Sequence, residues 1–250
     1  MMIAAIIPAR YESTRFRGKP LVRICNKPML QWVYEAARSC TLINQVIIAT
    51  DHEKIKQAAE SFGARVCMTA PTHATGTDRV AEVAQHLDAH IIVNLQGDEP
   101  LLVPAAISEA LMPVLEDETL PLSSLKTIID DETDILNPNV VKVVTDINDC
   151  ALYFSRSPIP FRKDKKPSAA MFRHIGLYVF RKDFLLTFSR LPRTMLEKAE
   201  NLEQLRVLEH GYRIKVPTSN YKPVGVDTPE DVARVETILM SKNITMKTNG

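Results

Sequence analysis

The stretch that decides the fold is residues 3–19, Ile3-Ala-Ala-Ile-Ile-Pro-Ala-Arg-Tyr-Glu-Ser-Thr-Arg-Phe-Arg-Gly-Lys19. Its first five residues are apolar without polar alternation, which is typical of a strand buried on both faces of a parallel sheet. A cationic loop follows, because residues 10–27 carry six Lys or Arg and a single acid. Ligands bind to loops at the carboxyl edge of α/β sheets, so this loop predicts a site for a polyanion, with phosphate as the first candidate.

Apolar runs alternate with helical patterns through the first half of the chain. Strands are predicted at residues 3–7, 45–50, 65–68 and 91–95, and helices at 28–40, 53–62, 78–87 and 104–115. This alternation predicts an α/β protein with a mostly parallel central sheet and helices on both faces.

The second half is less regular. Strands are predicted at residues 122–129, 140–145, 152–155, 175–180 and 212–216, and helices at 182–190, 201–209 and 228–240. We therefore expect a single domain over residues 1–250 with an inserted subdomain or dimerisation element at about 150–215. The polar residues 241–250 are expected to form a flexible tail.

Composition excludes several classes of protein. The net charge is +1 and aromatic residues make up 6%, so neither a general field for nucleic acid nor a base-stacking surface is expected. The four cysteines have no Cys-x-x-Cys spacing, which argues against a zinc site and a disulfide framework. We find no signal peptide or membrane-length apolar run, and we expect a cytoplasmic protein without a membrane partner.

Ordered motifs give the chain a family resemblance. Besides Pro8-Ala-Arg…Ser13-Thr-Arg15…Lys19-Pro-Leu, they are Asn94-Leu-Gln-Gly-Asp98-Glu-Pro100, Asn137-Pro-Asn-Val-Val-Lys142-Val, Tyr153-Phe-Ser-Arg156, Arg173-His-Ile-Gly176, Leu202-Glu-Gln-Leu-Arg-Val-Leu208 and Gly225-Val-Asp227-Thr-Pro-Glu-Asp231. Together they resemble the cytidylyltransferases that activate acidic sugars, most of all those acting on 3-deoxy-manno-octulosonate (Kdo). The resemblance covers residue 3 to about residue 235 and implies a Rossmann-like nucleotidyltransferase fold.

The basic loop has the charge to hold a nucleoside triphosphate, which brings about four negative charges that need compensation. The resemblance assigns Arg10, Arg15 and Lys19 to the triphosphate and to catalysis, and Pro8 and Ala9 to the edge of the base. The hydroxyl of Ser13 could add a hydrogen bond. The alternative from the residues alone is a solvated surface turn.

Two aspartates are candidate metal ligands. Asp98 follows the predicted strand 91–95 and would reach the same sheet edge as Arg10, where Mg²⁺ could bridge it to phosphate. A simple turn is the alternative. Asp227 precedes a helix start that Thr228 and Pro229 already explain as cap and first residue. The resemblance makes Asp98 and Asp227 the Mg²⁺ ligands.

The resemblance assigns the remaining candidates to the base and the sugar. The resemblance places Gly76, Thr77, Arg79 and Gln96 at the nucleotide, although Thr77 could simply cap the helix that follows. It places the sugar at Arg156, His174, Tyr178, Glu203 and Gln204. As alternatives, His174 and Tyr178 could be structural, and Glu203 and Gln204 could form the exposed face of a helix that buries Leu202, Leu205 and Leu208.

The resemblance implies transfer of CMP from CTP to the anomeric hydroxyl of Kdo, releasing pyrophosphate. The product would serve lipopolysaccharide biosynthesis, and the enzyme would be a homodimer that binds sugar through residues of the 150–215 element. Alternative readings are a sialic acid cytidylyltransferase, a nucleotidyltransferase for a sugar 1-phosphate, and a non-catalytic nucleotide sensor on the same fold.

Overall fold

The computed structural model describes residues 1–12, 16–163 and 170–248, with the side chains of the last helix described as far as Ser241. Its internal contacts divide the chain into two compact units. The first unit comprises Ile3–Leu87, Asn94–Pro104 and Pro223–Gly250, and the second comprises Met1–Met2, Asp88–Val93 and Ala105–Lys222. Residues 150–215, expected to form an inserted element, therefore lie within the second unit and make up only part of it.

Parallel strands form the sheet of the first unit. β1 (Ile3–Ala9), β4 (Gln45–Thr50) and β5 (Arg65–Met68) lie in this order, with Ala4 opposite Gln45 and Ile47 opposite Arg65. β1 and β4 are buried along almost their whole length, as predicted for strands covered on both faces. The predicted α/β class is confirmed.

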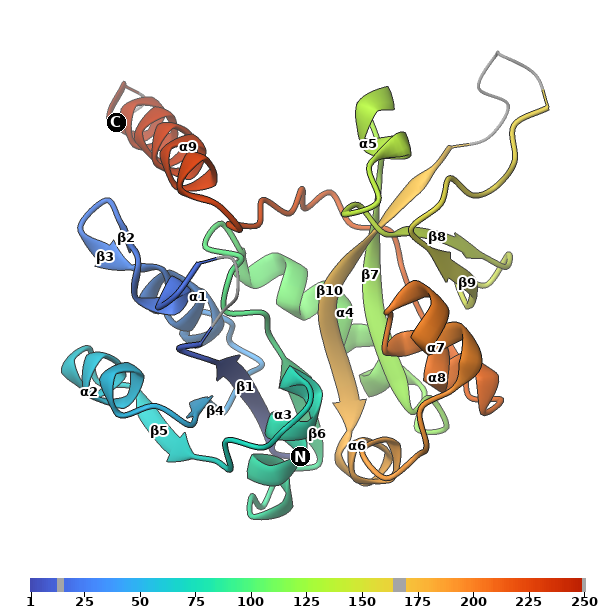
Figure 1. Cartoon of the computed structure of the whole chain (residues 1–250), viewed down its shortest axis with the longest axis horizontal. Helices are drawn as coiled ribbons and strands as arrows, with labels where there is room; N and C mark the ends of the chain where they lie inside the picture. Colours follow the sequence, from blue (N-terminus) through green and yellow to red (C-terminus); the bar gives the residue numbers. More distant parts are fainter. Residues whose placement is uncertain (13–15, 164–169, 249–250) are drawn as a thin grey trace. The chain divides into compact units, whose positions relative to one another are not determined.

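Helices of the first unit follow its strands, as Figure 1 shows for α1 (Met29–Arg38), α2 (Glu53–Ser61) and α3 (Gly76–Gln85). α1 buries Leu30, Val33 and Ala37, which recur at helical spacing. α3 begins two residues before its predicted start. Thr75 is its cap and forms a capping box with Asp78, so the prediction that Thr77 caps this helix is wrong.

Short elements that were not predicted lie in the second half of the basic loop. They are the 3₁₀ turn η1 (Lys19–Leu21) and the hairpin of β2 (Arg23–Ile24) and β3 (Lys27–Pro28). Cys25 and Asn26 connect the hairpin strands with positive φ angles, as a tight two-residue turn requires. The last helix, α9 (Pro229–Thr248), contributes Val235 to a core cluster with Ile24 and Met29. α9 continues past residue 240, its predicted end.

The second unit contains a mixed sheet in the order β11-β7-β10-β6, with β8 and β9 beside β10. Its strands are β6 (Ile91–Asn94), β7 (Leu122–Ile128), β8 (Lys142–Thr145), β9 (Ala151–Ser155), β10 (Phe172–Arg181) and β11 (Ile214–Lys215). β10 is antiparallel to β7 and β8, whereas β11 is parallel to β7. The parallel arrangement predicted from the first half therefore does not extend through this unit.

Helices of the second unit are α4 (Pro104–Glu116), α5 (Glu132–Leu136), α6 (Lys182–Phe188), α7 (Met195–Glu200) and α8 (Gln204–Glu209). α5 and α7 were not predicted, because helices of five and six residues leave almost no periodic signal. None of the helices in the described ranges combines the length and the apolar character needed to cross a bilayer.

Candidate active site

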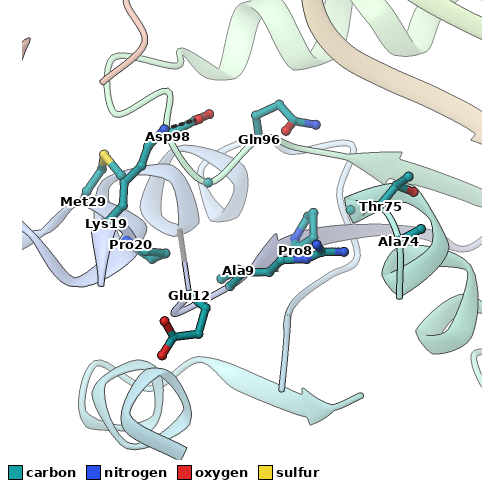
Figure 2. Close-up of a pocket in the computed structure, with 13 residues that line it drawn as sticks. Pro8, Ala9, Glu12, Lys19, Pro20, Met29, Ala74, Thr75, Gln96 and Asp98 are labelled. Atoms are coloured by element: carbon teal, nitrogen blue, oxygen red, sulfur yellow. Dashed lines mark hydrogen bonds and ion pairs between the residues drawn. The ribbon is translucent and has the colours of Figure 1, made fainter. Parts of the chain in front are cut away.

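A cavity of about 530 Å³ lies in the first unit, where β1 ends. Figure 2 shows the residues around it, which come from the end of β1, the basic loop, the first residue of α1, the start of α3 and the segment after β6. The lining residues are Pro8, Ala9, Arg10, Glu12, Lys19, Pro20, Met29, Ala74, Thr75, Gly76, Gln96, Gly97 and Asp98. Seven of these residues were predicted from the sequence. Asp98 was predicted as a metal ligand, and the six predicted to contact the nucleotide are Pro8, Ala9, Arg10, Lys19, Gly76 and Gln96.

Lys19 is the charged centre of this site. Its Nζ atom lies 2.6 Å from Oδ2 of Asp98 and 2.9 Å from Oδ1 of Asp227. The Lys19 side chain is 13% exposed, whereas those of Asp98 and Asp227 are 39% and 45% exposed. The structure thus brings together the three residues that the sequence predicts to converge, although they are up to 208 positions apart in the chain.

Local structure fixes the direction of each of these side chains. Gly18, with φ of 70°, turns the backbone so that η1 begins at Lys19. Asp98 follows Gly97, which lies against β1: a Cβ atom there would be in contact with the Pro8 oxygen, at 3.4 Å. The carbonyl of Asp98 accepts a hydrogen bond from the Val226 amide at 3.0 Å, which joins the two segments that carry the aspartates.

Asp227 is held by the start of α9. The carboxylate of Asp231 accepts hydrogen bonds from the amides of Asp227 and Thr228, both at 2.9 Å. Thr228 in turn accepts from the Asp231 amide, so it caps α9 as predicted. This reciprocal capping leaves the Asp227 side chain directed to Lys19.

Electrostatics favour a charged Lys19. Burial alone would lower the pKa of Lys19, but attraction and hydrogen bonds from Asp98 and Asp227 outweigh it and the pKa is raised. The ammonium therefore stays protonated at neutral pH. Together the three groups carry one more negative than positive charge.

The two carboxylates are of the kind that Mg²⁺ takes as ligands. Asp98 and Asp227 both lie within hydrogen-bond distance of one cationic atom, Nζ of Lys19, so their side chains converge on one point. Mg²⁺ takes one or two carboxylates and completes its shell with phosphate oxygens and water. Within the described part of the chain, no three His, Cys, Asp or Glu side chains gather as a complete metal cage.

The other predicted nucleotide residues differ in position. Pro8, Ala9, Arg10, Gly76 and Gln96 line the cavity. Arg10 donates from Nη2 to the His73 carbonyl at 2.6 Å, which links the basic loop to the segment before α3. A Cβ atom on Gly76 would lie 3.3 Å from Cγ of Pro8, so glycine allows this approach. Ser13 and Arg15 lie outside the described residues.

Thr77 and Arg79 do not line the cavity. Arg79 is fully buried, donates from Nη2 to Asp51 at 2.7 Å, and hydrogen-bonds Thr69 through Nη1. Thr77 is also buried and accepts from Nδ2 of Asn94 at 3.4 Å. The predicted contact of Thr77 and Arg79 with the base stays a prediction.

Sequence reasoning missed some lining residues. Glu12 is an acid beside a predicted phosphate site, and it pairs with Arg17 at 2.9 Å in an exposed ion pair. Glu12 is the single acid of the basic loop, and this was the feature of the sequence that could have identified it as a site residue. Met29 and Thr75 gave no comparable signal, because an apolar residue and a helix cap have ordinary structural explanations.

Four of the predicted sugar-binding residues form part of the second unit's β10 and α8. His174 is buried and hydrogen-bonds Ser124 at 2.8 Å, and its ring lies 5.4 Å from that of Tyr178. Burial and the nearby Arg173 lower the pKa of His174 to about 3, so its ring is neutral near pH 7. Burial and the charge of Glu203 raise the pKa of Tyr178, so its hydroxyl stays protonated.

Glu203 and Gln204 stand at the start of α8. Gln204 is buried, so the alternative that it belongs to an exposed helix face is wrong. Glu203 is half-buried and close enough to Tyr178 to act on its pKa. His174, Tyr178 and Glu203 are therefore neighbours.

Arg156 is directed to main-chain carbonyls. Its Nε, Nη1 and Nη2 donate to the carbonyl oxygens of Glu200, Pro138 and Asn201 at 2.7, 2.9 and 3.3 Å. The carbonyls of Glu200 and Asn201 belong to the end of α7. The last carbonyl groups of a helix have no partner within the helix, so Arg156 supplies hydrogen bonds to two of them. The predicted contact of Arg156 with a sugar carboxylate stays a prediction.

Comparisons with known proteins agree with this geometry. A family model described as cytidylyltransferase matches residues 4–214. A 3-deoxy-manno-octulosonate cytidylyltransferase of Solibacter usitatus (strain Ellin6076) is 52% identical over 99% of this chain and 98% of its own. One of Geotalea uraniireducens (strain Rf4) is 55% identical over 94% of this chain and 98% of its own.

A solved structure has the same fold at high similarity. It is a CMP:2-keto-3-deoxy-manno-octonic acid synthetase complexed with CTP, 39% identical, with a TM-score of 0.92. The match covers 97% of this chain and 100% of the other. The chain therefore belongs to the cytidylyltransferase family and, within it, to the 3-deoxy-manno-octulosonate cytidylyltransferases.

Proposed function

We propose that this chain transfers CMP from CTP to the anomeric hydroxyl of Kdo, giving CMP-Kdo for lipopolysaccharide biosynthesis and pyrophosphate. The observation that carries the proposal is the meeting of Lys19, Asp98 and Asp227 beside a cavity lined by Arg10 and Gln96. The names of the relatives and the CTP bound to the similar synthetase support the choice of substrates.

In this proposal the basic loop contacts the phosphates of CTP. Lys19, Arg10 and Arg15 compensate the charge of the triphosphate and of the departing pyrophosphate, with Ser13 as a further donor. Pro8, Ala9, Gly76 and Gln96 border the base. Asp98 and Asp227 are the residues that would hold Mg²⁺, and a bound Mg²⁺ would supply Lewis-acid polarisation of phosphoryl oxygens and of the acceptor hydroxyl.

The reaction needs no covalent intermediate on the protein. The anomeric hydroxyl attacks the α-phosphorus, the bond to the bridging oxygen of pyrophosphate breaks, and the hydroxyl proton leaves to solvent. Positioning and charge neutralisation carry the rate. Sugar binding falls to five residues of the second unit: Arg156, His174, Tyr178, Glu203 and Gln204. The protein is proposed to work as a cytoplasmic homodimer, with the 150–215 element contributing to dimerisation.

Substrate choice is tested by pyrophosphate release with CTP, Mg²⁺ and three acceptors: Kdo, a sialic acid and a sugar 1-phosphate. Kdo is expected to give the highest kcat/KM, because a site selects its own hydroxyl pattern over analogues that leave buried polar groups unpaired. Turnover with sialic acid alone, or with no acceptor of the panel, would contradict the proposal.

Chelation of divalent cations is expected to abolish pyrophosphate release, and added Mg²⁺ to restore it. The melting temperature without CTP should barely change, because the Lys19 ammonium already neutralises part of the charge on Asp98 and Asp227. Full activity in EDTA would remove the metal from the proposal. The measurement is a titration of activity against free Mg²⁺, with thermal melts in parallel.

A further inference from the structure

Two aromatic rings, those of Tyr11 and His52, stack beside the basic loop and are not among the residues that line the cavity. The rings of Tyr11 and His52 have centroids 4.0 Å apart and planes 11° apart. Lys54 Nζ and the Arg17 guanidinium carbon lie 5.3 and 5.8 Å from the Tyr11 centroid, within the range of cation–π attraction. The stack is therefore held by both dispersion and charge.

His52 has a fixed position because it caps α2. Its Nδ1 accepts a hydrogen bond from the Lys54 amide at 3.2 Å, and its carbonyl accepts from the Ile55 amide at 3.0 Å. Its own amide donates to Oγ1 of Thr50 at 3.3 Å, at the end of β4. The imidazole is thus anchored to both a helix and a strand of the first unit.

Tyr11 transmits this position to Lys19. The Tyr11 carbonyl accepts a hydrogen bond from the Gly18 amide at 2.8 Å. A Cβ atom on Gly18 would lie 3.3 Å from Cε2 of Tyr11, so the glycine backbone packs against the ring itself. Gly18 directly precedes Lys19, whose long flexible side chain reaches Asp98 and Asp227 only from a well-placed backbone.

We propose that His52 and Tyr11 are positioning residues whose stacked rings hold Gly18, and through it the Lys19 ammonium, where the triphosphate of CTP binds. This inference rests on the proposed function of the cavity. Loops move more than the elements that they connect, and a small misplacement of a catalytic group is costly. A rigid aromatic support would keep Lys19 in place.

Two substitutions of His52 separate the ring from the helix cap. His52→Asn keeps a good N-cap and removes the ring, whereas His52→Phe keeps a ring and removes the cap. His52→Asn is expected to lower kcat/KM for CTP between about tenfold and about a hundredfold, while His52→Phe retains most of the activity. The melting temperatures should follow the opposite order, with His52→Phe the less stable variant.

Gln57→Gly is the matched control, because it weakens α2 at an exposed position without touching either ring. It should lower the melting temperature and leave kcat/KM for CTP near the wild-type value. Wild-type activity in His52→Asn, or an equal loss in His52→Asn and His52→Phe, would overturn the inference. Tyr11→Leu and Tyr11→Phe repeat the comparison from the other ring if a His52 variant does not fold.

Amide hydrogen exchange at Gly18, followed by NMR without substrates, tests the same inference independently of catalysis. Exchange should be faster than wild type in His52→Asn and close to wild type in His52→Phe, because the Gly18 amide is bonded to Tyr11. Unchanged exchange in His52→Asn would refute the support by the rings. A wild-type protein that releases no pyrophosphate would instead refute the proposed function.

Discussion

Replacing Asp98 with Asn is expected to lower kcat/KM for CTP by about a thousandfold while the protein stays folded. Asn has the shape of Asp but no charge, so the site loses half of its anionic pair. Lys19 keeps Asp227 at 2.9 Å, and the Asp98 side chain is 39% exposed. An ion pair with such an exposed partner contributes little to the free energy of unfolding, on the order of 1 kcal/mol or less.

The measurement is pyrophosphate release over a range of CTP and Mg²⁺ concentrations, with a thermal melt of each variant. Glu60→Gln is the matched control, since it removes an exposed carboxylate from the same unit and should leave kcat/KM unchanged. Asp227→Asn should impair activity in the same direction as Asp98→Asn. Wild-type kcat/KM in Asp98→Asn at saturating Mg²⁺ would contradict the role given to this carboxylate.

The centre of the site could be predicted from the sequence because its residues follow buried strands directly. The apolar run before Pro8 and the one before Gln96 are plain strand signals, and parallel strands carry their loops to one sheet edge. The meeting of Lys19 and Asp98 at 2.6 Å follows from that topology. Asp227 was placed at the site by the family resemblance, because capping explains its neighbours and leaves Asp227 itself without a structural reason.

The sequence did not reveal the hydrogen-bond partners of arginines whose partners are distant in the chain. Arg79 has a buried guanidinium that bonds Asp51 and Thr69, partners that the sequence did not reveal, and its expected contact with the base stays a prediction. Arg156 donates to carbonyls at the end of α7, and its expected contact with a sugar carboxylate stays a prediction. α7 is too short to give a periodic signal, so nothing in the sequence revealed those carbonyls as partners of Arg156.

The hairpin of β2 and β3 also depends on contacts that could not be predicted from the sequence. Its turn uses Cys25 and Asn26 at φ of 47° and 65°, without the glycine that usually marks such a turn. Tertiary contacts sustain it, because the Cys25 amide donates to Glu236 of α9 at 2.8 Å and Ile24 is fully buried. Packing against a helix more than 200 positions later overrides the local preference.

Replacing Glu197 with Ala is expected to lower the free energy of unfolding at pH 7 by about 3–5 kcal/mol. Glu197 accepts from Nε and Nη2 of Arg206 at 2.8 and 2.6 Å, and their side chains are 1% and 5% exposed. Truncation would leave the Arg206 charge buried without its carboxylate. The pair joins α7 to α8, so activity with Kdo should also fall if Glu203 and Gln204 serve the sugar.

The dependence on pH gives this prediction a second, independent readout. Burial alone would raise the pKa of Glu197, but the hydrogen bonds and charge of Arg206 outweigh it and the pKa is lowered. A lowered pKa in the folded state adds stability above the unfolded-state pKa, and this stability is lost as the pH falls through the folded-state pKa. The difference between wild type and Glu197→Ala in urea unfolding should therefore shrink on strong acidification.

The paired variant Glu197→Leu with Arg206→Met distinguishes a lost ion pair from a lost shape. Apolar side chains of similar size need no charged partner, so the double variant is expected to unfold at higher urea than Glu197→Ala. Arg206 also lies over the Phe188 ring at 4.5 Å, a contact that Met can replace in part through its sulfur. A double variant less stable than Glu197→Ala would show that packing dominates at this site and that the unpaired charge costs little.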